Sequence, residues 1–250
     1  MAIAVWGGLF YHSSIADARA RQESARSEPQ VTAVLAAGTT TASSAPTPTP
    51  IPTPSAASDP SLPSLAVLGD TFTSGVDVDP ADTWPGVLCR QVGCRYLPTY
   101  AVARTGYTYP GADGLTATQR VEAVVSAQPD IVVLAVGASD TSATQEQMSV
   151  AFTQVLDRLS TGLPQAQVVV LSPFWPSAPA PAPVITMRSW VYDIAVPRGV
   201  QFVNVTDLFD AAHADLVQPA GFAPDLRGHA YIAQTVREFV QAARDGVPLT

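Results

Sequence analysis

From residue 64 onwards, hydrophobic residues fall into short continuous runs that alternate with longer periodic segments. The continuous runs predict buried strands, and apolar residues spaced three or four positions apart predict helices. Strands that are apolar on both faces and alternate with helices predict a parallel sheet covered on both sides. We expect strands at 65–70, 99–103, 130–137, 167–173 and 201–205, and helices at 83–93, 115–127, 144–163, 185–196 and 229–244.

The first part of the chain has a different pattern. It begins with the apolar run AIAVWGGLFY of 10 residues, half of the roughly 20 residues that a membrane-spanning helix needs. Residues 39–63 are rich in Pro, Thr and Ser, which excludes helix and sheet and favours an extended spacer. We therefore divide the chain into an N-terminal segment (1–38) that would be the remnant of an anchor, a linker (39–63) and a domain (64–250). This organisation favours an extracellular or cell-surface protein over one with a disordered tail of no specific use.

The charge and cysteine content limit which partners the chain can bind. The net charge is −8, and all 13 basic residues are arginine. An acidic chain without a basic cluster is poorly suited to nucleic acids or anionic membranes, so we expect no nucleic acid partner and membrane contact only through the N-terminal segment. The two cysteines, Cys89 and Cys94, are too few for a zinc site, and we expect no metal and no cofactor. They form either a small disulfide loop in an exported protein or two half-buried thiols.

Four motifs near the predicted strand ends resemble, in order, the four blocks of the SGNH (GDSL-type) hydrolases. GDTFTSG (69–75) resembles the nucleophile block, and AVARTGYTYPG (101–111) resembles the block with an oxyanion-hole glycine. VLAVGASD (133–140) resembles Gly-x-Asn-Asp, and AGFAPDLRGHAYIA (220–233) resembles the Asp-x-x-His-Pro block. The resemblance covers about 64–244. It implies a three-layer α/β/α, flavodoxin-like fold with a central parallel sheet, and ester hydrolysis by serine, histidine and aspartate.

The residues needed in the first three blocks are replaced. Thr71 stands at the position of the serine, and its β-methyl group stiffens χ1. Arg104 stands at the position of the glycine, where its side chain would fill the oxyanion pocket unless it points outward; an offset of two residues would place Gly106 there. Ser139 stands at the position of the asparagine and is too short to present the same amide donor.

The last block lacks both members of the acid–base pair. Ala220 replaces the aspartate and Ala223 replaces the histidine, and a methyl group can neither accept nor orient a proton. His229 aligns with the position at the start of the family's last helix and not with the family's catalytic histidine. A displaced base at His213, with Asp210 and Asp215 nearby in sequence, is the alternative to a surface loop histidine.

Other residues near the strand ends have predicted roles in structure or binding. We expect Asp70 to hold the turn after the first strand and Asp140 to cap the following helix. Trp84, Tyr107, Phe174 and Trp175 are candidates for lining a groove, with a core role favoured for Trp84 and a binding rim favoured for Phe174 and Trp175. We expect the ligand-binding residues to be Asp70, Thr71, Gly106, Ser139 and Trp175.

These observations support two functional hypotheses. In the first, the domain has lost catalysis and is a binding or structural module whose ligand is a carbohydrate, an acyl group or an envelope protein. In the second, it is a weak or altered esterase that uses Thr71 as its nucleophile. A third interpretation, a subunit of a larger assembly docked through the N-terminal segment, stays open.

Overall fold

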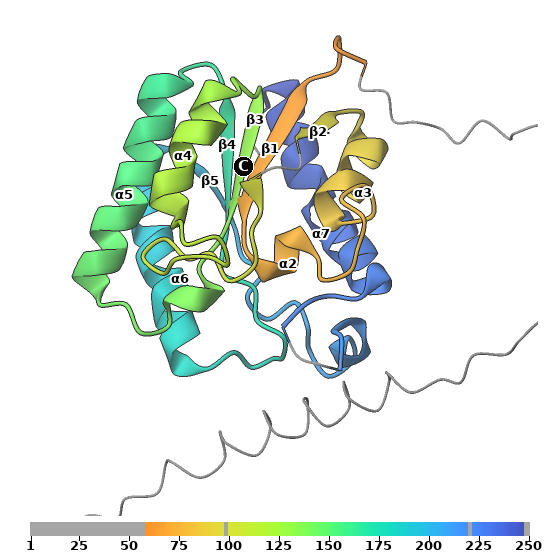
Figure 1. Ribbon diagram of the computed structural model, residues 1–250, viewed down its shortest axis with the longest axis vertical. Coiled ribbons are helices and arrows are strands. Elements are labelled where there is room, and N and C mark those ends of the chain that lie inside the picture. Colours follow the sequence, from red (N-terminus) through yellow and green to blue (C-terminus); the bar gives the residue numbers. More distant parts are fainter. Residues whose placement is uncertain (1–58, 98–99, 220–221, 248–250) are drawn as a thin grey trace, which may run out of the picture. The chain divides into compact units, whose positions relative to one another are not determined.

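The computed structural model describes residues 59–97, 100–219 and 222–247 (Figure 1). The predicted N-terminal segment and most of the linker lie outside the described residues. Five parallel strands form one sheet in the order β2-β1-β3-β4-β5. They are β1 (Ser64–Gly69), β2 (Arg95–Leu97), β3 (Ile131–Ala135), β4 (Gln167–Leu171) and β5 (Gln201–Val203). This is the doubly wound, flavodoxin-like order, and it confirms the predicted fold class.

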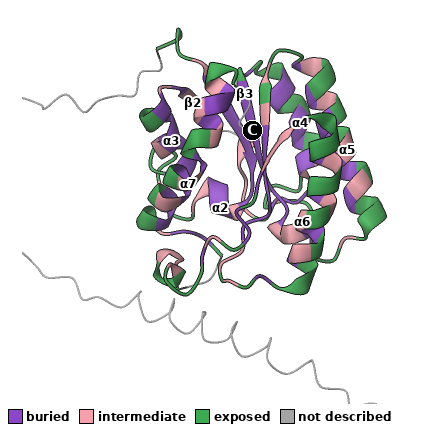
Figure 2. Ribbon diagram, turned by 180° about the vertical axis from the view of Figure 1, so that it is seen from behind, coloured by how far each residue is buried: buried purple, intermediate pink, exposed green. Residues whose placement is uncertain are grey.

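Helices cover both faces of the sheet (Figure 1). On one face lie α3 (Trp84–Val92) and α7 (Leu226–Asp245), and on the other lie α4 (Ala117–Ser126), α5 (Gln145–Gly162) and α6 (Ala182–Ala195). Successive side chains of a strand point to opposite faces. Leu65 and Val67 accordingly pack with α3 and α7, whereas Ala66 and Leu68 pack with α4 and α5. The central strands are therefore buried on both sides (Figure 2).

The second strand lies earlier in the chain than predicted. Arg95–Leu97 pairs with the start of β1, whereas within the predicted range 99–103 Ala101 makes only an isolated bridge to Gly69. The reason is the abrupt end of α3. Gly93 has a left-handed φ of 72° and turns the chain straight into the sheet.

A disulfide bond joins Cys89 to Cys94. It links the last turn of α3 to the residue before β2, where the Cys94 amide also donates to the Cys89 carbonyl at 3.0 Å. Of the two alternatives that the sequence left open, the structure has the disulfide loop. Among the described residues, no helix is long and apolar enough to cross a membrane.

Short helical turns follow several strands and position the side chains at their carboxyl ends. The single turn α2 (Thr71–Ser74) begins directly after β1, and the 3₁₀ turn η2 (Ala138–Asp140) follows β3. Gly69 of β1 pairs with Ala135 of β3, so these two turns stand on adjacent strands at the same edge of the sheet. Two further 3₁₀ turns among the described residues are η3 (Val196–Arg198) and η4 (Ala214–Leu216).

Candidate functional site

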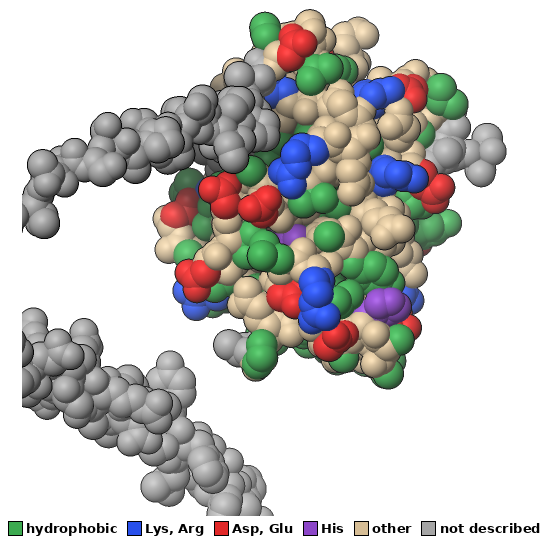
Figure 3. Space-filling model, turned by 90° about the vertical axis from the view of Figure 1, so that its right-hand side faces the viewer, with side chains coloured by type: hydrophobic (Ala, Val, Ile, Leu, Met, Phe, Trp, Pro, Cys, Tyr) green, Lys and Arg blue, Asp and Glu red, His purple; other side chains and the backbone are tan. Residues whose placement is uncertain are grey.

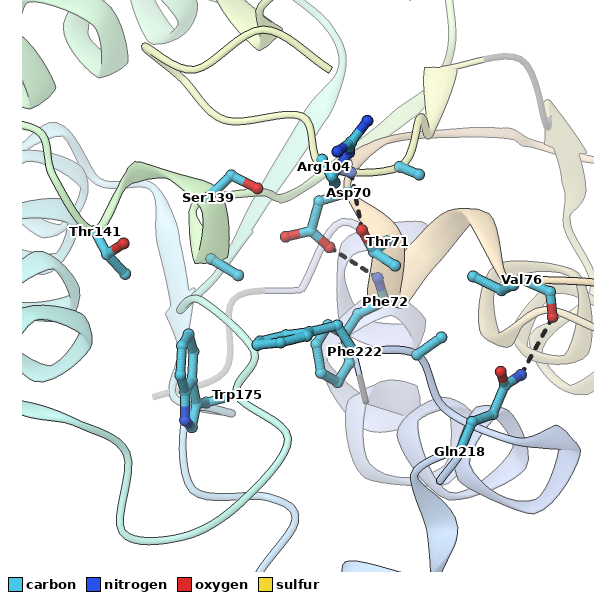
Figure 4. A pocket seen from close by; sticks show the side chains of 13 residues that line it. Asp70, Thr71, Phe72, Val76, Arg104, Ser139, Thr141, Trp175, Gln218 and Phe222 are labelled. Atoms are coloured by element: carbon cyan, nitrogen blue, oxygen red, sulfur yellow. Dashed lines mark hydrogen bonds between the residues drawn. The ribbon is translucent and has the colours of Figure 1, made fainter. Parts of the chain in front are cut away.

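A cavity of about 540 Å³ lies at the carboxyl ends of β1 and β3 (Figure 4). In open parallel sheets this edge, where neighbouring connections run to opposite faces, is the usual site of ligand binding. Four of the five residues predicted to bind a ligand line the cavity: Asp70, Thr71, Ser139 and Trp175. The fifth, Gly106, is not among the lining residues. The structure therefore places four of the predicted residues around one cavity. Gly106 is not among them, and Arg104 lines the cavity in its place.

Thr71 begins α2, and its hydroxyl lies at the cavity wall. The backbone amide of Arg104 donates a hydrogen bond to Thr71 Oγ1 at 2.8 Å (Figure 4). Arg104, and not Gly106, therefore faces the position of the family's nucleophile. This position can donate through its backbone N–H with arginine as well as with glycine, because a backbone donor does not depend on the side chain.

Arg104 has a backbone conformation that few arginines adopt. Its φ is 63°, in the left-handed region that favours glycine. The guanidinium group is exposed and points away from Thr71 (Figure 4). The side chain therefore leaves the cavity open and places a positive charge at its rim.

Asp140 organises the loop after Gly106 and does not cap the following helix as predicted; Thr144 caps α5. The carboxylate of Asp140 accepts hydrogen bonds from the amides of residues 107, 108 and 109 and from the Thr108 hydroxyl, at 2.6–3.0 Å. Gly106 makes this possible, because a Cβ atom there would lie 2.5 Å from Asp140 Oδ1. The glycine that the sequence offered as a second alignment thus has a packing role.

Asp70 holds the turn after β1, as predicted. Its Oδ1 accepts the amide of Phe72 at 3.0 Å and caps α2. The side chain is only 1% exposed, and its Oδ2 has no hydrogen-bond partner. Burial raises the pKa of the Asp70 carboxyl to about 7, although the backbone amides of Phe72 and Ala138 oppose the shift. This carboxyl is therefore largely protonated below neutral pH.

The last block contributes a methyl group and not a base. Ala223 is 3% exposed and lines the cavity, whereas Ala220 lies outside the described residues. The loop before Ala223 is linked to the segment after α2 by Gln218, whose side chain donates a hydrogen bond to the Val76 carbonyl at 3.2 Å. Gln218 and Phe222 also line the cavity. Gln218 lies outside the four motifs, and Phe222 lies within the last one but was not predicted to be a site residue.

The histidines of the domain face elsewhere. His213 Nδ1 lies 2.7 Å from Asp210 Oδ1, and its ring stacks on Tyr231, so the proposed displaced base does not reach the cavity lining. His229 is fully buried and its Nδ1 accepts the amide of Trp84 at 3.1 Å. Burial lowers the pKa of His229 to about 4, so it is neutral. Among the described residues, no imidazole lines the cavity and no three His, Cys, Asp or Glu side chains form a potential metal site.

The aromatic residues divide between core and cavity differently than expected. Trp84 is buried, as predicted. Tyr107 and Phe174 are each 1% exposed, so the groove role for Tyr107 and the rim role for Phe174 were wrong. Trp175 does line the cavity, where its ring meets Phe222 edge-on at 5.6 Å. Phe174 is buried because its ring stacks on Phe72 at a centroid distance of 5.5 Å and packs against Trp84.

Comparison with known proteins identifies the family. The profile of the GDSL-like lipase/acylhydrolase family matches residues 67–231, and the chain therefore belongs to that family. It is 26% identical over 194 residues to a GDSL lipase of Mycobacterium tuberculosis, a match that covers 73% of this chain and 83% of that protein.

Solved structures share the fold at low sequence identity. An aryl esterase from M. smegmatis superimposes with a TM-score of 0.58 at 14% identity, covering 72% of this chain and 99% of that one. A carbohydrate acetylesterase from Sinorhizobium meliloti gives 0.57 at 14% identity, covering 72% and 99%. A putative lipolytic protein of the G-D-S-L family from Desulfitobacterium hafniense gives 0.57 at 16% identity, covering 72% and 98%. At this identity the likeness concerns the fold alone.

Proposed function

We propose that this domain is a catalytically inactive member of the GDSL family that binds a ligand in the cavity. The observation that carries the proposal is the methyl group of Ala223 at the cavity wall, where the family's histidine would stand. Nucleophilic attack by a hydroxyl at neutral pH needs a base within hydrogen-bond reach. The described histidines are engaged elsewhere, so Thr71 has no imidazole to take its proton.

The state of the cavity supports binding over a purely structural role. Arg104 points outward, and about 540 Å³ stays open, within the range of ~300–1,000 Å³ typical of small-ligand sites. Candidate ligands are a carbohydrate, an acyl group or an envelope protein. The apolar side chains along much of the wall favour the acyl group.

A weak or altered esterase is the second candidate, and one contact favours it. Thr71 keeps a hydroxyl at the cavity wall and receives the Arg104 N–H at 2.8 Å, so one oxyanion-type donor remains. Such a donor and binding alone can leave roughly 10³–10⁴-fold acceleration over water in an enzyme whose triad has been removed. Traces of activity therefore fit both candidates, and the dependence on Thr71 decides between them.

The deciding experiment is hydrolysis of p-nitrophenyl acetate by the full chain and its Thr71→Ala variant. Thr161→Ala is the matched control, because Thr161 is an exposed threonine whose hydroxyl bonds within its own helix. We expect all three proteins to give the same low rate. Turnover well above background that is lost in Thr71→Ala and kept in Thr161→Ala would establish the esterase.

We also propose an extracellular or cell-surface location. The Pro/Thr-rich linker is typical of spacers between a membrane and an exported domain, and the Cys89–Cys94 disulfide fits an oxidising compartment. Digestion of the protein on intact cells by an added protease, with a cytoplasmic marker as control, tests this. If the protein resisted the protease as fully as the cytoplasmic marker does, the proposed location would be wrong.

A further inference from the structure

The cavity has two chemically different ends (Figure 4). Hydroxyl groups of Thr71 and Ser139 lie at one end, together with the rim arginine. The aromatic pair of Trp175 and Phe222 lies at the other end. A ligand that fills such a cavity carries oxygen atoms at one end and an apolar body at the other.

The rim arginine gives the polar end a charge that the protein does not neutralise. Elsewhere on the surface, charges of both signs are interspersed, as on the face formed by α3 and α7 (Figure 3). Arginines there pair with acids, for example Arg90 with Asp82 and Arg227 with Asp215. Within the described part of the chain, no ion pair includes Arg104. Its guanidinium is therefore available to a ligand.

Thr71 and Ser139 add hydroxyl donors at the polar end, and Asp70 is the one acidic side chain among the lining residues. Thr71 Oγ1 already accepts the Arg104 amide, so its own hydrogen is directed to another acceptor. Asp70 is buried beside it with Oδ2 unpartnered, and its carboxyl is largely protonated below neutral pH. Hydroxyl donors at this end of the cavity and a guanidinium at its rim match a carboxylate.

We propose that the cavity binds a monoanionic amphiphile, a free carboxylic acid with an alkyl or aryl body. Its carboxylate lies beside the Thr71 hydroxyl and draws the exposed Arg104 guanidinium in from the rim, and its body packs against Trp175. This inference rests on the proposed function, because an esterase would release such an acid whereas a binding module retains it. The positive charge is that of Arg104, which stands at the family's glycine position. The preference for a carboxylate therefore depends on this residue and not on the fold.

Calorimetric titration of the full chain with octanoate, 1-octanol and octylammonium tests the inference, since the three probes share a body and differ in charge. We expect octanoate to bind about tenfold or more tightly than octanol, as one charge-assisted pair implies, and octylammonium to bind most weakly. Arg104→Gln should reduce octanoate binding to the level of octanol, and Arg104→Lys should restore part of it. Trp175→Ala should weaken octanoate and octanol by the same factor.

Arg237→Gln is the matched control, because Arg237 is an exposed arginine of α7 that does not line the cavity. It should change nothing, and circular dichroism verifies that every variant is folded. Equal binding of octanoate and octanol, no effect of Arg104→Gln, or no octanoate binding below its micelle concentration would each overturn the inference. These failures leave the inactive, non-hydrolytic domain standing, whereas Thr71-dependent turnover overturns the proposed function whatever octanoate does.

Discussion

The backbone amide of Arg104 donates to Thr71 Oγ1 at 2.8 Å, although Arg104 has the positive φ that favours glycine. The loop thus presents a backbone donor to Thr71, while its side chain places a positive charge at the rim of the cavity. A left-handed non-glycine residue costs on the order of 1–3 kcal/mol and persists only where its surroundings hold it. Backbone geometry and side-chain chemistry are therefore separable at this site.

Restoring the family's side chains should restore hydrolysis. We expect the triple variant Thr71→Ser, Ala220→Asp, Ala223→His to hydrolyse p-nitrophenyl acetate about 10²–10⁴-fold faster than the wild type, the usual contribution of general base catalysis. Ala212→His, which adds an imidazole on an exposed loop residue, is the control. A triple variant no faster than this control would show that the last loop does not hold residue 223 within reach of residue 71.

Removing the Asp140 carboxylate should destabilise the fold. Asp140→Ala leaves the amides of residues 107–109 and the Thr108 hydroxyl without their acceptor. Burial raises the pKa of Asp140, so part of this loss is offset by relief of desolvation. We expect a net decrease of about 2–4 kcal/mol in the free energy of unfolding in urea. Asp157→Ala, at an exposed position of α5, should stay within about 0.5 kcal/mol of the wild type, and equal effects of the two would contradict this role.

The sequence predicted the sheet well because its strands are continuous apolar runs, and the four motifs located the cavity edge. It could not predict the role of Asp140, since hydrogen bonds to an adjacent loop leave no periodic pattern. It misplaced Phe174, because in a proline-rich segment neither strand nor helix spacing tells which side chain points inward. It also missed Phe222, whose significance depends on an aromatic partner from another loop. Local pattern thus determined the elements, whereas contacts between loops determined the site.

Stability should depend on the titration of His229. Its folded-state pKa is about 4, below about 6.5 for a free histidine, so the unfolded chain binds the proton first as the pH falls. The neutral imidazole contributes fully to the free energy of unfolding above pH ~6.5. This contribution, about 3 kcal/mol at most, is lost as the pH falls from ~6.5 to ~4. Urea unfolding from pH 4 to 7 should show the advantage of the wild type over His229→Gln shrinking as the pH falls. Asp70 and Asp140 titrate in both proteins and cancel, so a constant difference would refute this assignment.

Reducing the disulfide should lower stability moderately. The Cys89–Cys94 bond closes a loop with a sequence separation of 5, for which loop entropy predicts about 2 kcal/mol. The unfolding free energy should fall by this amount in a reductant, and the double variant Cys89→Ser, Cys94→Ser should be unaffected by reductant. Because the chain has 2 cysteines, intact-mass measurement before and after alkylation reports their state directly. Alkylation of both without reductant would contradict the bond.

Carboxylate binding should weaken as the pH rises through about 7. Asp70 becomes negatively charged there and repels the bound anion. Of the groups that face it, Asp140 also has a pKa raised by burial, and Tyr107 stays neutral because burial raises its pKa. Octanoate titrations between pH 6 and 8 should lose this dependence in Asp70→Asn and keep it in Asp157→Asn. The same slope in Asp70→Asn would assign the effect to another group.

The amide of Trp84 bonds to the ring of His229 at the start of α3. This contact limits which histidine could act as a base for Thr71. The buried imidazole is committed to the scaffold, so no change of rotamer can bring it to Thr71. A base for Thr71 would therefore have to come from another position of the chain. A histidine at position 223 would supply the imidazole, and an aspartate at position 220 would orient it. The scaffold histidine and a catalytic histidine are thus separate requirements on this fold.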